Sequence, residues 1–179
     1  MVRCFIGFVI PENVKDSIVK TQNEILKLPL VCKLVERENL HICFSFLGEV
    51  EELEIEKIKD KIKKLAERYK GFDVKLEGIK AIPNQKFIRV IVLSVIDNEN
   101  LLERIRKDVQ SEIGGDSKPP HLTLCRVKDV TNKDYANKKL DEMKNLYVTS
   151  FTLDSIQLIK SELSRKGPIY AVIHSSKFM

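Results

Sequence analysis

The sequence predicts a fold of mixed α and β class, built as one unit from two pseudo-symmetric lobes. Helical and strand-like segments alternate along its 179 residues, and one histidine-bearing segment occurs twice. This length is sufficient for a substantial buried core but not for several independent domains. The 43% hydrophobic and 32% charged content is typical of a soluble globular chain.

Four segments have the apolar spacing of amphipathic helices with one buried face. The expected helices cover residues 12–27, 51–70, 98–113 and 132–145. Pro11 favours the start of the first helix, Thr131 caps the last, and Gly71 and Gly114 end the second and third. We interpret the many charges of the second helix as its solvated face, because a stripe of Ile, Leu and Tyr residues marks its buried face.

Runs rich in Val, Ile and Phe lie between these helices and predict strands. They cover residues 3–10, 33–36, 41–47, 72–82, 86–96, 121–127, 150–160 and 168–174. The first run ends at Pro11 and lacks a small-residue cleavage pattern, so we interpret it as a strand and not as a signal peptide. No later segment reaches the roughly 18 apolar residues of a membrane span. We therefore expect a cytoplasmic protein without a membrane partner.

Charge and cysteine content narrow the range of ligands. The formal net charge of +5 favours an anionic partner, but it is well below that of a protein that coats nucleic acid. The four cysteines show no C-x-x-C spacing, which argues against a zinc site or a disulfide framework and for reduced thiols. We expect neither a metal nor an organic cofactor.

An internal repeat is the most informative feature of the sequence. Residues 41–50 can be aligned with residues 121–130. In each segment a strand that begins with histidine is followed by an acidic residue and Val, and then by an expected helix. Because strand side chains alternate between faces, each histidine shares a face with the residue two positions on, Cys43 or Thr123. Two such units can form pseudo-symmetric lobes with their histidines opposed across a cleft.

Two facing histidines can cleave a phosphodiester by acid–base catalysis. A neutral imidazole takes a proton from the attacking water, and a protonated one gives a proton to the leaving oxygen. Both forms coexist near neutrality, since an unperturbed histidine titrates at about pH 6.5. Small donors such as Cys43 and Thr123 can hold the non-bridging oxygens. We interpret the third histidine, His174, as a packing residue, because its strand has no matching partner.

The motifs His41-Ile-Cys-Phe and His121-Leu-Thr-Leu resemble the paired H-x-T-x motifs of the two-histidine phosphoesterase family, in the branch of 2′-5′ RNA ligases and RNA 2′,3′-cyclic phosphodiesterases. The likeness covers nearly the whole chain, from the opening Arg3-x-Phe5 to Gly167-Pro168-x-Tyr170. It implies an α+β fold in which residues 1–179 form a single bilobal catalytic domain. Antiparallel sheets would line a central cleft, with helices outside.

The same resemblance implies a function and a set of site residues. The reaction would be metal-independent hydrolysis of a 2′,3′-cyclic phosphate at an RNA end to a 2′-phosphate, with a reversible 2′-5′ RNA ligation that needs no ATP. His41 and His121 would be catalytic, and Cys43, Thr123 and Arg126 would bind the phosphate. We expect His41 to be the acid and His121 the base, because the intact Thr123 accompanies the latter. RNA ends such as those of tRNA fragments are the expected partner, and a monomer is the expected state.

The residues leave several alternatives open. Cys43 stands where the family has threonine, so it is either a near-isostere or, alternatively, a covalent nucleophile. Arg126 points away from His121 under strict alternation, so either the strand ends or bulges before it or Arg126 is only a rim or structural charge. A degenerate first motif would instead fit a non-catalytic RNA- or nucleotide-binding module.

Charged and aromatic residues outside the two motifs are further candidates for RNA contacts. Lys160, Arg165 and Lys166 can steer RNA toward the cleft. Phe5, Phe44 and Tyr170 are candidates for stacking on bases, although Phe44 is expected in the core because it faces away from His41.

Overall fold

The computed structural model describes residues 1–165 and 167–179, so Lys166 lies outside the described residues. All four expected helices are present within these ranges, each slightly shorter than expected. The expected cap Thr131 is wrong, because the last helix begins after Asn132, whose side-chain oxygen accepts a hydrogen bond from the Tyr135 N–H. None of the described helices is both long and apolar enough to cross a membrane. The helices are α1 (Glu12–Ile25), α2 (Glu52–Ala66), α3 (Leu101–Glu112) and α4 (Lys133–Glu142), with a short 3-10 helix, η1 (Arg37–Asn39).

Nine strands occupy the expected apolar runs of the described chain, with one exception. The single strand expected over residues 150–160 is wrong, because the chain leaves the strand conformation at Asp154 and forms two strands that pair with different neighbours. No Gly or Pro marks this break in the sequence. The strands are β1 (Val2–Val9), β2 (Leu30–Leu34), β3 (His41–Val50), β4 (Phe72–Asn84), β5 (Phe87–Ile96), β6 (His121–Val130), β7 (Tyr147–Leu153), β8 (Ser155–Ser164) and β9 (Gly167–Lys177).

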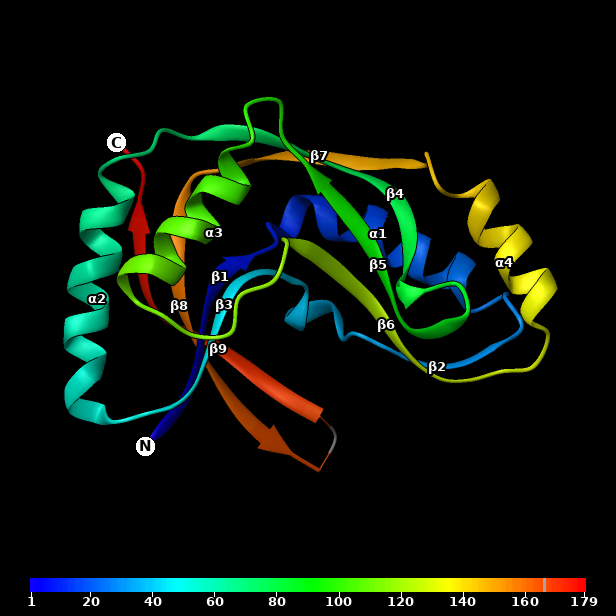
Figure 1. Cartoon of the computed structure of the whole chain (residues 1–179), viewed down its shortest axis with the longest axis horizontal. Helices are drawn as coiled ribbons and strands as arrows, with labels where there is room; N and C mark the ends of the chain where they lie inside the picture. The colour runs from blue at the N-terminus through cyan, green and yellow to red at the C-terminus, as the bar shows by residue number, and fades with distance from the viewer. Residues whose placement is uncertain (166) are drawn as a thin grey trace.

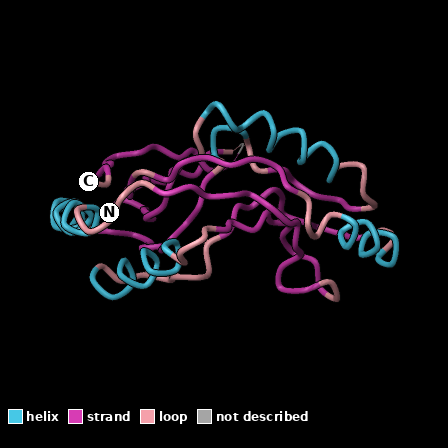
Figure 2. The backbone as a smooth tube through the Cα atoms, turned by 90° about the horizontal axis from the view of Figure 1, so that it is seen from above, coloured by secondary structure: helices cyan, strands magenta, loops and turns pink. Residues whose placement is uncertain are grey.

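The strands form one antiparallel sheet, which confirms the α+β class. Their order is β7-β4-β5-β6-β3-β1-β8-β9, and β2 lies beside β6 (Figure 1). The two halves of the sheet meet where β3 pairs with β6, through Ile42 and Leu122. Figure 2 shows α1 and α3 on opposite sides of the strand layer, with α2 and α4 at its two ends.

The two halves have the same internal register, as the sequence repeat predicts. β1 pairs with β3 with a shift between Ile6 and Gly7, and β5 pairs with β6 with a shift at the equivalent place, between Ile91 and Val92. β8 and β4 then occupy equivalent positions outside β1 and β5. The pattern of buried, half-buried and exposed residues along β3 is also the same as that along β6. The halves are therefore pseudo-symmetric, with the histidine strands adjacent at the centre.

The helices stabilise this sheet by covering its apolar side chains. α1 follows a strand of one half but packs on β6 and β7 of the other, and α3 crosses in the opposite sense to pack on β3. Ile42, Leu122 and Phe44 are fully buried in the shared core, as expected for Phe44. The crossing helices thus join the two halves of the sheet.

Candidate active site

The β3–β6 junction places both histidines on one face of the sheet. Ile42 and Leu122 pair with each other and point into the core, so their neighbours along each strand point to the opposite, open face. The antiparallel register sets His41 beside Thr123 and His121 beside Cys43. Each histidine therefore adjoins the small residue of the other motif as well as that of its own. The two histidines are diagonal neighbours, for which a separation of roughly 7–8 Å is usual, and a phosphate can bridge that distance.

Both imidazole rings are oriented in the same way. Nδ1 of His41 donates a hydrogen bond to the carbonyl oxygen of Asn39 at 2.7 Å, and Nδ1 of His121 donates to that of Pro119 at 2.9 Å. A carbonyl oxygen can only accept, so Nδ1 carries the proton in each neutral ring and Nε2 is left as the basic atom. Nε2 is consequently the atom of each histidine that can take up or release a catalytic proton.

Aromatic side chains enclose His41. Its ring centroid lies 4.8 Å from that of Phe5 and 5.0 Å from that of Tyr170, which approaches edge-on. Phe5 is only 1% exposed, so it packs in the core and cannot stack on a base. The ring centroid of Phe46, which is not among the expected site residues, lies 5.6 Å from that of Phe5, and Phe46 is 48% exposed. Asn39 secures this wall by donating to the carbonyl oxygen of Pro168 at 2.8 Å, which ties β9 to the start of β3.

Burial lowers the pKa of His41 below its ordinary value. The hydrogen bond to the Asn39 carbonyl opposes this effect, while the charges of His121 and Arg126 add to it. The neutral imidazole of His41 is therefore favoured near neutral pH. The positive charge of Arg126 therefore acts on the imidazole of His41.

Arg126 reaches the open face because β6 contains a bulge. Its register against β5 shifts between Thr123 and Cys125, and Leu124 and Cys125 are buried one after the other. Alternation then resumes with Arg126 exposed on the same face as Thr123. Burial raises the pKa of Tyr170, and the charge of Arg126 opposes that rise, so the charge of Arg126 acts on both Tyr170 and His41. The strand therefore bulges before Arg126 and does not end there.

Cys43 lies half-buried on the same face, and its thiol is protonated. Burial raises the pKa of Cys43 to about 12, with a backbone hydrogen bond at Ser45 opposing the rise and the carboxylate of Asp116 adding to it. Since the thiolate is the nucleophilic form of cysteine, this environment disfavours covalent catalysis. A protonated thiol can still donate a weak hydrogen bond to a phosphate oxygen.

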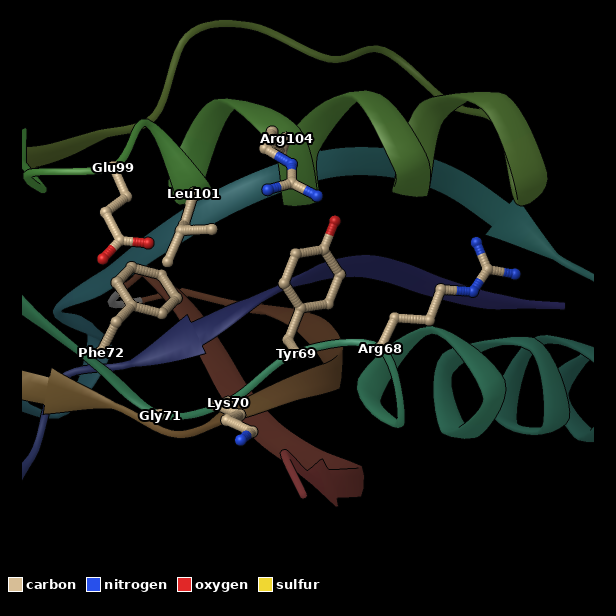
Figure 3. Close-up of a pocket in the computed structure, with 8 residues that line it drawn as sticks. All are labelled: Arg68, Tyr69, Lys70, Gly71, Phe72, Glu99, Leu101 and Arg104. Atoms are coloured by element: carbon tan, nitrogen blue, oxygen red, sulfur yellow. The ribbon is translucent and has the colours of Figure 1, made fainter.

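A hollow of about 620 Å³ adjoins the second histidine, and we name it the His121 hollow. Its walls come from β4, from the end of β5, from the segment Pro119–His121 and from the turn after α4, which carries Lys144. A smaller hollow of about 300 Å³ lies elsewhere, between the end of α2 and the start of α3. Figure 3 shows Tyr69 and Arg104 lining this smaller hollow, and none of the expected site residues lines it.

The remaining candidate residues lie outside this constellation. Lys160 forms an ion pair with Glu162 at 2.5 Å, so its charge is locally balanced, and Arg165 is exposed at the end of the β8–β9 hairpin. His174 hydrogen-bonds to Ser176 within β9 at 2.9 Å, as a packing residue would. The described residues contain no group of three or more His, Cys, Asp or Glu side chains placed to hold a metal ion.

Comparison with known proteins yields a family match over most of the chain. The LigT-like phosphoesterase family matches residues 9–92 and 95–170. An RNA 2′,3′-cyclic phosphodiesterase of Methanocaldococcus jannaschii is 39% identical over 177 residues, covering 96% of this chain and 98% of that protein. The protein of the same name from Methanothermobacter thermautotrophicus is 30% identical over 174 residues, covering 94% and 95%.

Solved structures show the same fold. The crystal structure of TT0787 of Thermus thermophilus superposes with a TM-score of 0.78 at 24% identity, covering 98% of this chain and 97% of that one. The apo form of LigT of Escherichia coli superposes with a TM-score of 0.74 at 20% identity, covering 99% and 98%. At these identities the likeness confirms the architecture.

Proposed function

Because this chain belongs to the LigT-like phosphoesterase family, we propose that it is a phosphodiesterase that opens the 2′,3′-cyclic phosphate at an RNA end and leaves a 2′-phosphate. The observation that carries the proposal is the pair of histidines on one face, each with Nδ1 bound to a carbonyl and Nε2 left for proton transfer. RNA is the substrate class in the names of both archaeal relatives. In this proposal residues 1–179 act as one catalytic domain and work as a monomer.

We propose that His121 takes a proton from the water that attacks phosphorus and that His41 gives a proton to the departing 3′ oxygen, as expected from the motifs. In both residues Nε2 is the atom that carries the proton, because Nδ1 is bound to a carbonyl oxygen. Burial lowers the pKa of His41, so a proton held there is released more readily than from an ordinary imidazole. Each proton transfer is worth about 10²–10⁴ in rate.

Three side chains beside the histidines support the phosphate. The guanidinium of Arg126 presents paired N–H donors that match two phosphate oxygens, and the Thr123 hydroxyl adds a third donor. The Cys43 thiol supplies a weaker one. Negative charge accumulates on the non-bridging oxygens in the transition state, so these donors accelerate the reaction.

We propose reversible 2′-5′ RNA ligation at the same site. A 5′ hydroxyl takes the place of water, its oxygen bonds to phosphorus, and the bond from phosphorus to the 3′ oxygen breaks. His121 accepts the hydroxyl proton and His41 protonates the 3′ oxygen. One ester bond is exchanged for another, so no ATP is needed.

The test is incubation with an RNA oligomer that ends in a 2′,3′-cyclic phosphate, followed by identification of the terminal phosphate. We expect a 2′-phosphate, formed equally with and without EDTA. His41→Ala and His121→Ala should each lower kcat by at least about 10²-fold, with circular dichroism to verify folding. Full activity in either variant would refute the mechanism. Tight binding of the oligomer without any product would favour a non-catalytic binding module.

A further inference from the structure

The two histidines come from different halves of the sheet, so they can act on a bound phosphate from opposite sides. His41 lies on β3, in the half that contains β1 and β8, and His121 lies on β6, in the half that contains β5 and β4. In a displacement at phosphorus the attacking and departing oxygens lie roughly in line. With His121 as the base, the attacking oxygen comes from the β4–β5 side, and the ribose that carries the departing 3′ oxygen lies on the His41 side.

The attacking side contains far more space than a water molecule needs. The His121 hollow has a volume of about 620 Å³, and His121 itself is one of its lining residues. A water molecule occupies about 30 Å³, whereas ligand sites commonly measure about 300–1,000 Å³. Hydrolysis alone leaves most of this hollow without a use. A nucleoside whose 5′ hydroxyl attacks phosphorus has the size to fill it.

A lysine stands in the wall of the His121 hollow where the other half has an uncharged residue. Lys80 of β4 pairs with Val92, which pairs with Thr123, so all three lie in one row on the open face. Two strand spacings separate Lys80 from Thr123, or about 10 Å. The equivalent position in β8 is Gln157, whose side-chain oxygen accepts a hydrogen bond from the Val9 backbone at 2.8 Å. Of these two equivalent positions, only the one on the attacking side carries a cation.

A second cation, Lys144, lies at the rim of the same hollow. Its turn packs against β4 at Gly78, whose N–H donates to the carbonyl oxygen of Leu146 at 2.9 Å. A Cβ atom at Gly78 would lie 2.5 Å from the carbonyl oxygen of Lys144, so glycine is required for this approach. Lys80 and Lys144 are both exposed, and neither forms an ion pair within residues 1–165 and 167–179.

The rest of the lining suits a nucleoside. Ile82 and Ile96 are 36% and 43% exposed, and Pro83 and Pro119 extend the apolar surface that a base can cover. Glu77 is the one acid among the described lining residues, against the two lysines, so the hollow keeps a positive balance.

We infer that the His121 hollow is the acceptor site for 2′-5′ ligation, where it binds the 5′-terminal nucleoside of a single-stranded RNA while Lys80 and Lys144 bind the backbone phosphates that follow. The inference rests on the proposed function and deepens its ligation step. A strand with a free 5′ hydroxyl carries its first negative charge on the 3′ side of that nucleoside, so the cations belong at the outer parts of the hollow and not beside His121.

The chemical step is balanced at this site. His121 takes the proton of the 5′ hydroxyl, the 5′ oxygen bonds to phosphorus, and the bond from phosphorus to the 3′ oxygen breaks as His41 gives it a proton. Proton exchange with water then restores both imidazoles.

The test follows both products in one reaction. A donor oligomer that ends in a 2′,3′-cyclic phosphate is incubated with increasing amounts of an acceptor oligomer that has a 5′ hydroxyl, and the initial rates of joined RNA and of 2′-phosphate are measured. Lys80→Ala/Lys144→Ala should lower kcat/KM for the acceptor about tenfold or more, and change hydrolysis of the donor alone less than about twofold. For the acceptor, the slope of log kcat/KM against log salt concentration should become shallower by about 1.4, or about 0.7 for each lost contact with a single strand.

Two controls isolate binding in the hollow. An acceptor oligomer whose 5′ hydroxyl is replaced by hydrogen cannot attack, but it should still displace the attacking water and slow donor hydrolysis. This inhibition should need about tenfold more oligomer in Lys80→Ala/Lys144→Ala than in the unaltered protein. Lys63→Ala/Lys64→Ala on α2 removes the same charge from two other exposed lysines and should have little effect on either product.

The outcomes that would overturn the inference are distinguishable. Equal acceptor kcat/KM in Lys80→Ala/Lys144→Ala and the unaltered protein removes it while leaving the proposed function intact. An equal loss of hydrolysis and ligation, or an equal loss in Lys63→Ala/Lys64→Ala, shows a general effect and also removes it. If the unaltered protein hydrolyses the donor, forms no joined RNA and is not slowed by the 5′-deoxy oligomer, the hollow is no acceptor site and only hydrolysis stands. If it opens no cyclic phosphate, the proposed function fails and this inference fails with it.

Discussion

Replacing Cys43 by threonine separates two roles for its thiol. Burial raises the pKa of Cys43 to about 12, so at pH 7 only about one thiol in 10⁵ is ionised. A nucleophilic cysteine would thus be almost entirely in its unreactive form. If Cys43 instead acts as a hydrogen-bond donor, almost all of its thiol is in the protonated form that can donate. A threonine hydroxyl at this position would be the stronger donor.

The expected effect of Cys43→Thr is a gain in activity. Complete loss of an oxyanion donor costs about 10²–10³ in kcat, and the thiol retains part of that contribution, so the gain should be between about 2-fold and 10²-fold. The fold accepts the residue, because Thr123 occupies the equivalent position of β6 at the same half-buried depth. The assay is the initial rate of 2′-phosphate formation from a cyclic-phosphate RNA oligomer.

Cys43→Val is the matched control, because valine has the shape of threonine without its hydroxyl. We expect it to fall below the unaltered protein, and the ratio of the Thr to the Val variant then measures the donor. Thermal unfolding of both variants verifies that they fold. An inactive but folded Cys43→Thr would refute this reasoning and assign the thiol a covalent role. Rapid alkylation of Cys43 by iodoacetamide at pH 7 would contradict the raised pKa.

Two further predictions concern stability. Burial holds the pKa of His41 below its unfolded value, so between those values the unfolded chain binds more protons, and the free energy of unfolding should decrease as the pH falls below about 6.5. His41→Gln should weaken this pH dependence and leave only the part due to His174, because burial also lowers the pKa of His174. The measurement is the difference between the urea unfolding midpoints at pH 7.5 and pH 5.5. A difference that is the same in His41→Gln and in the unaltered protein would contradict the prediction. Gly7→Ala should destabilise the fold by about 1–3 kcal/mol, because its Cβ would collide with the Ile42 carbonyl oxygen. Gly71→Ala is the control, because a Cβ atom at this position would meet only a side-chain methyl at 3.4 Å. Equal melting temperatures for the two variants would contradict the prediction.

The sequence predicted the four helices and most strands because apolar spacing reports directly which face of an element is buried. It also predicted that two histidine strands are related, since their residue patterns repeat. It failed at Asp154, where one apolar run became two strands. The run contains no turn residue with special backbone needs, and pairing partners far away in the chain determine where each strand ends.

Several features of the site arise only from the way strands pair. The bulge that turns Arg126 toward His41 follows from the register between β5 and β6, and Leu124-Cys125 is as compatible with an unbulged strand as with a bulged one. Phe46 emerges on the open face through the matching bulge of β3, which the alternating pattern also conceals. The His121 hollow depends on a turn held against Gly78 from a distant part of the chain.

The pseudo-symmetry of the fold explains why the two histidines can have different roles. The two halves have the same register, and each imidazole has the same tautomer and bonds the carbonyl oxygen two residues before it. The backbone alone would therefore give the two histidines equal chemistry. The difference comes from side chains outside the repeat, since Tyr170 and Phe5 surround His41, while the hollow leaves His121 open. Burial lowers the pKa of the enclosed histidine, so the two imidazoles are not chemically equal. Exchanging Tyr170 for a small residue should therefore raise the pKa of His41 and shift the limb of the kcat/KM profile that His41 controls to higher pH, whereas unmoved limbs would show that this enclosure does not distinguish the two histidines.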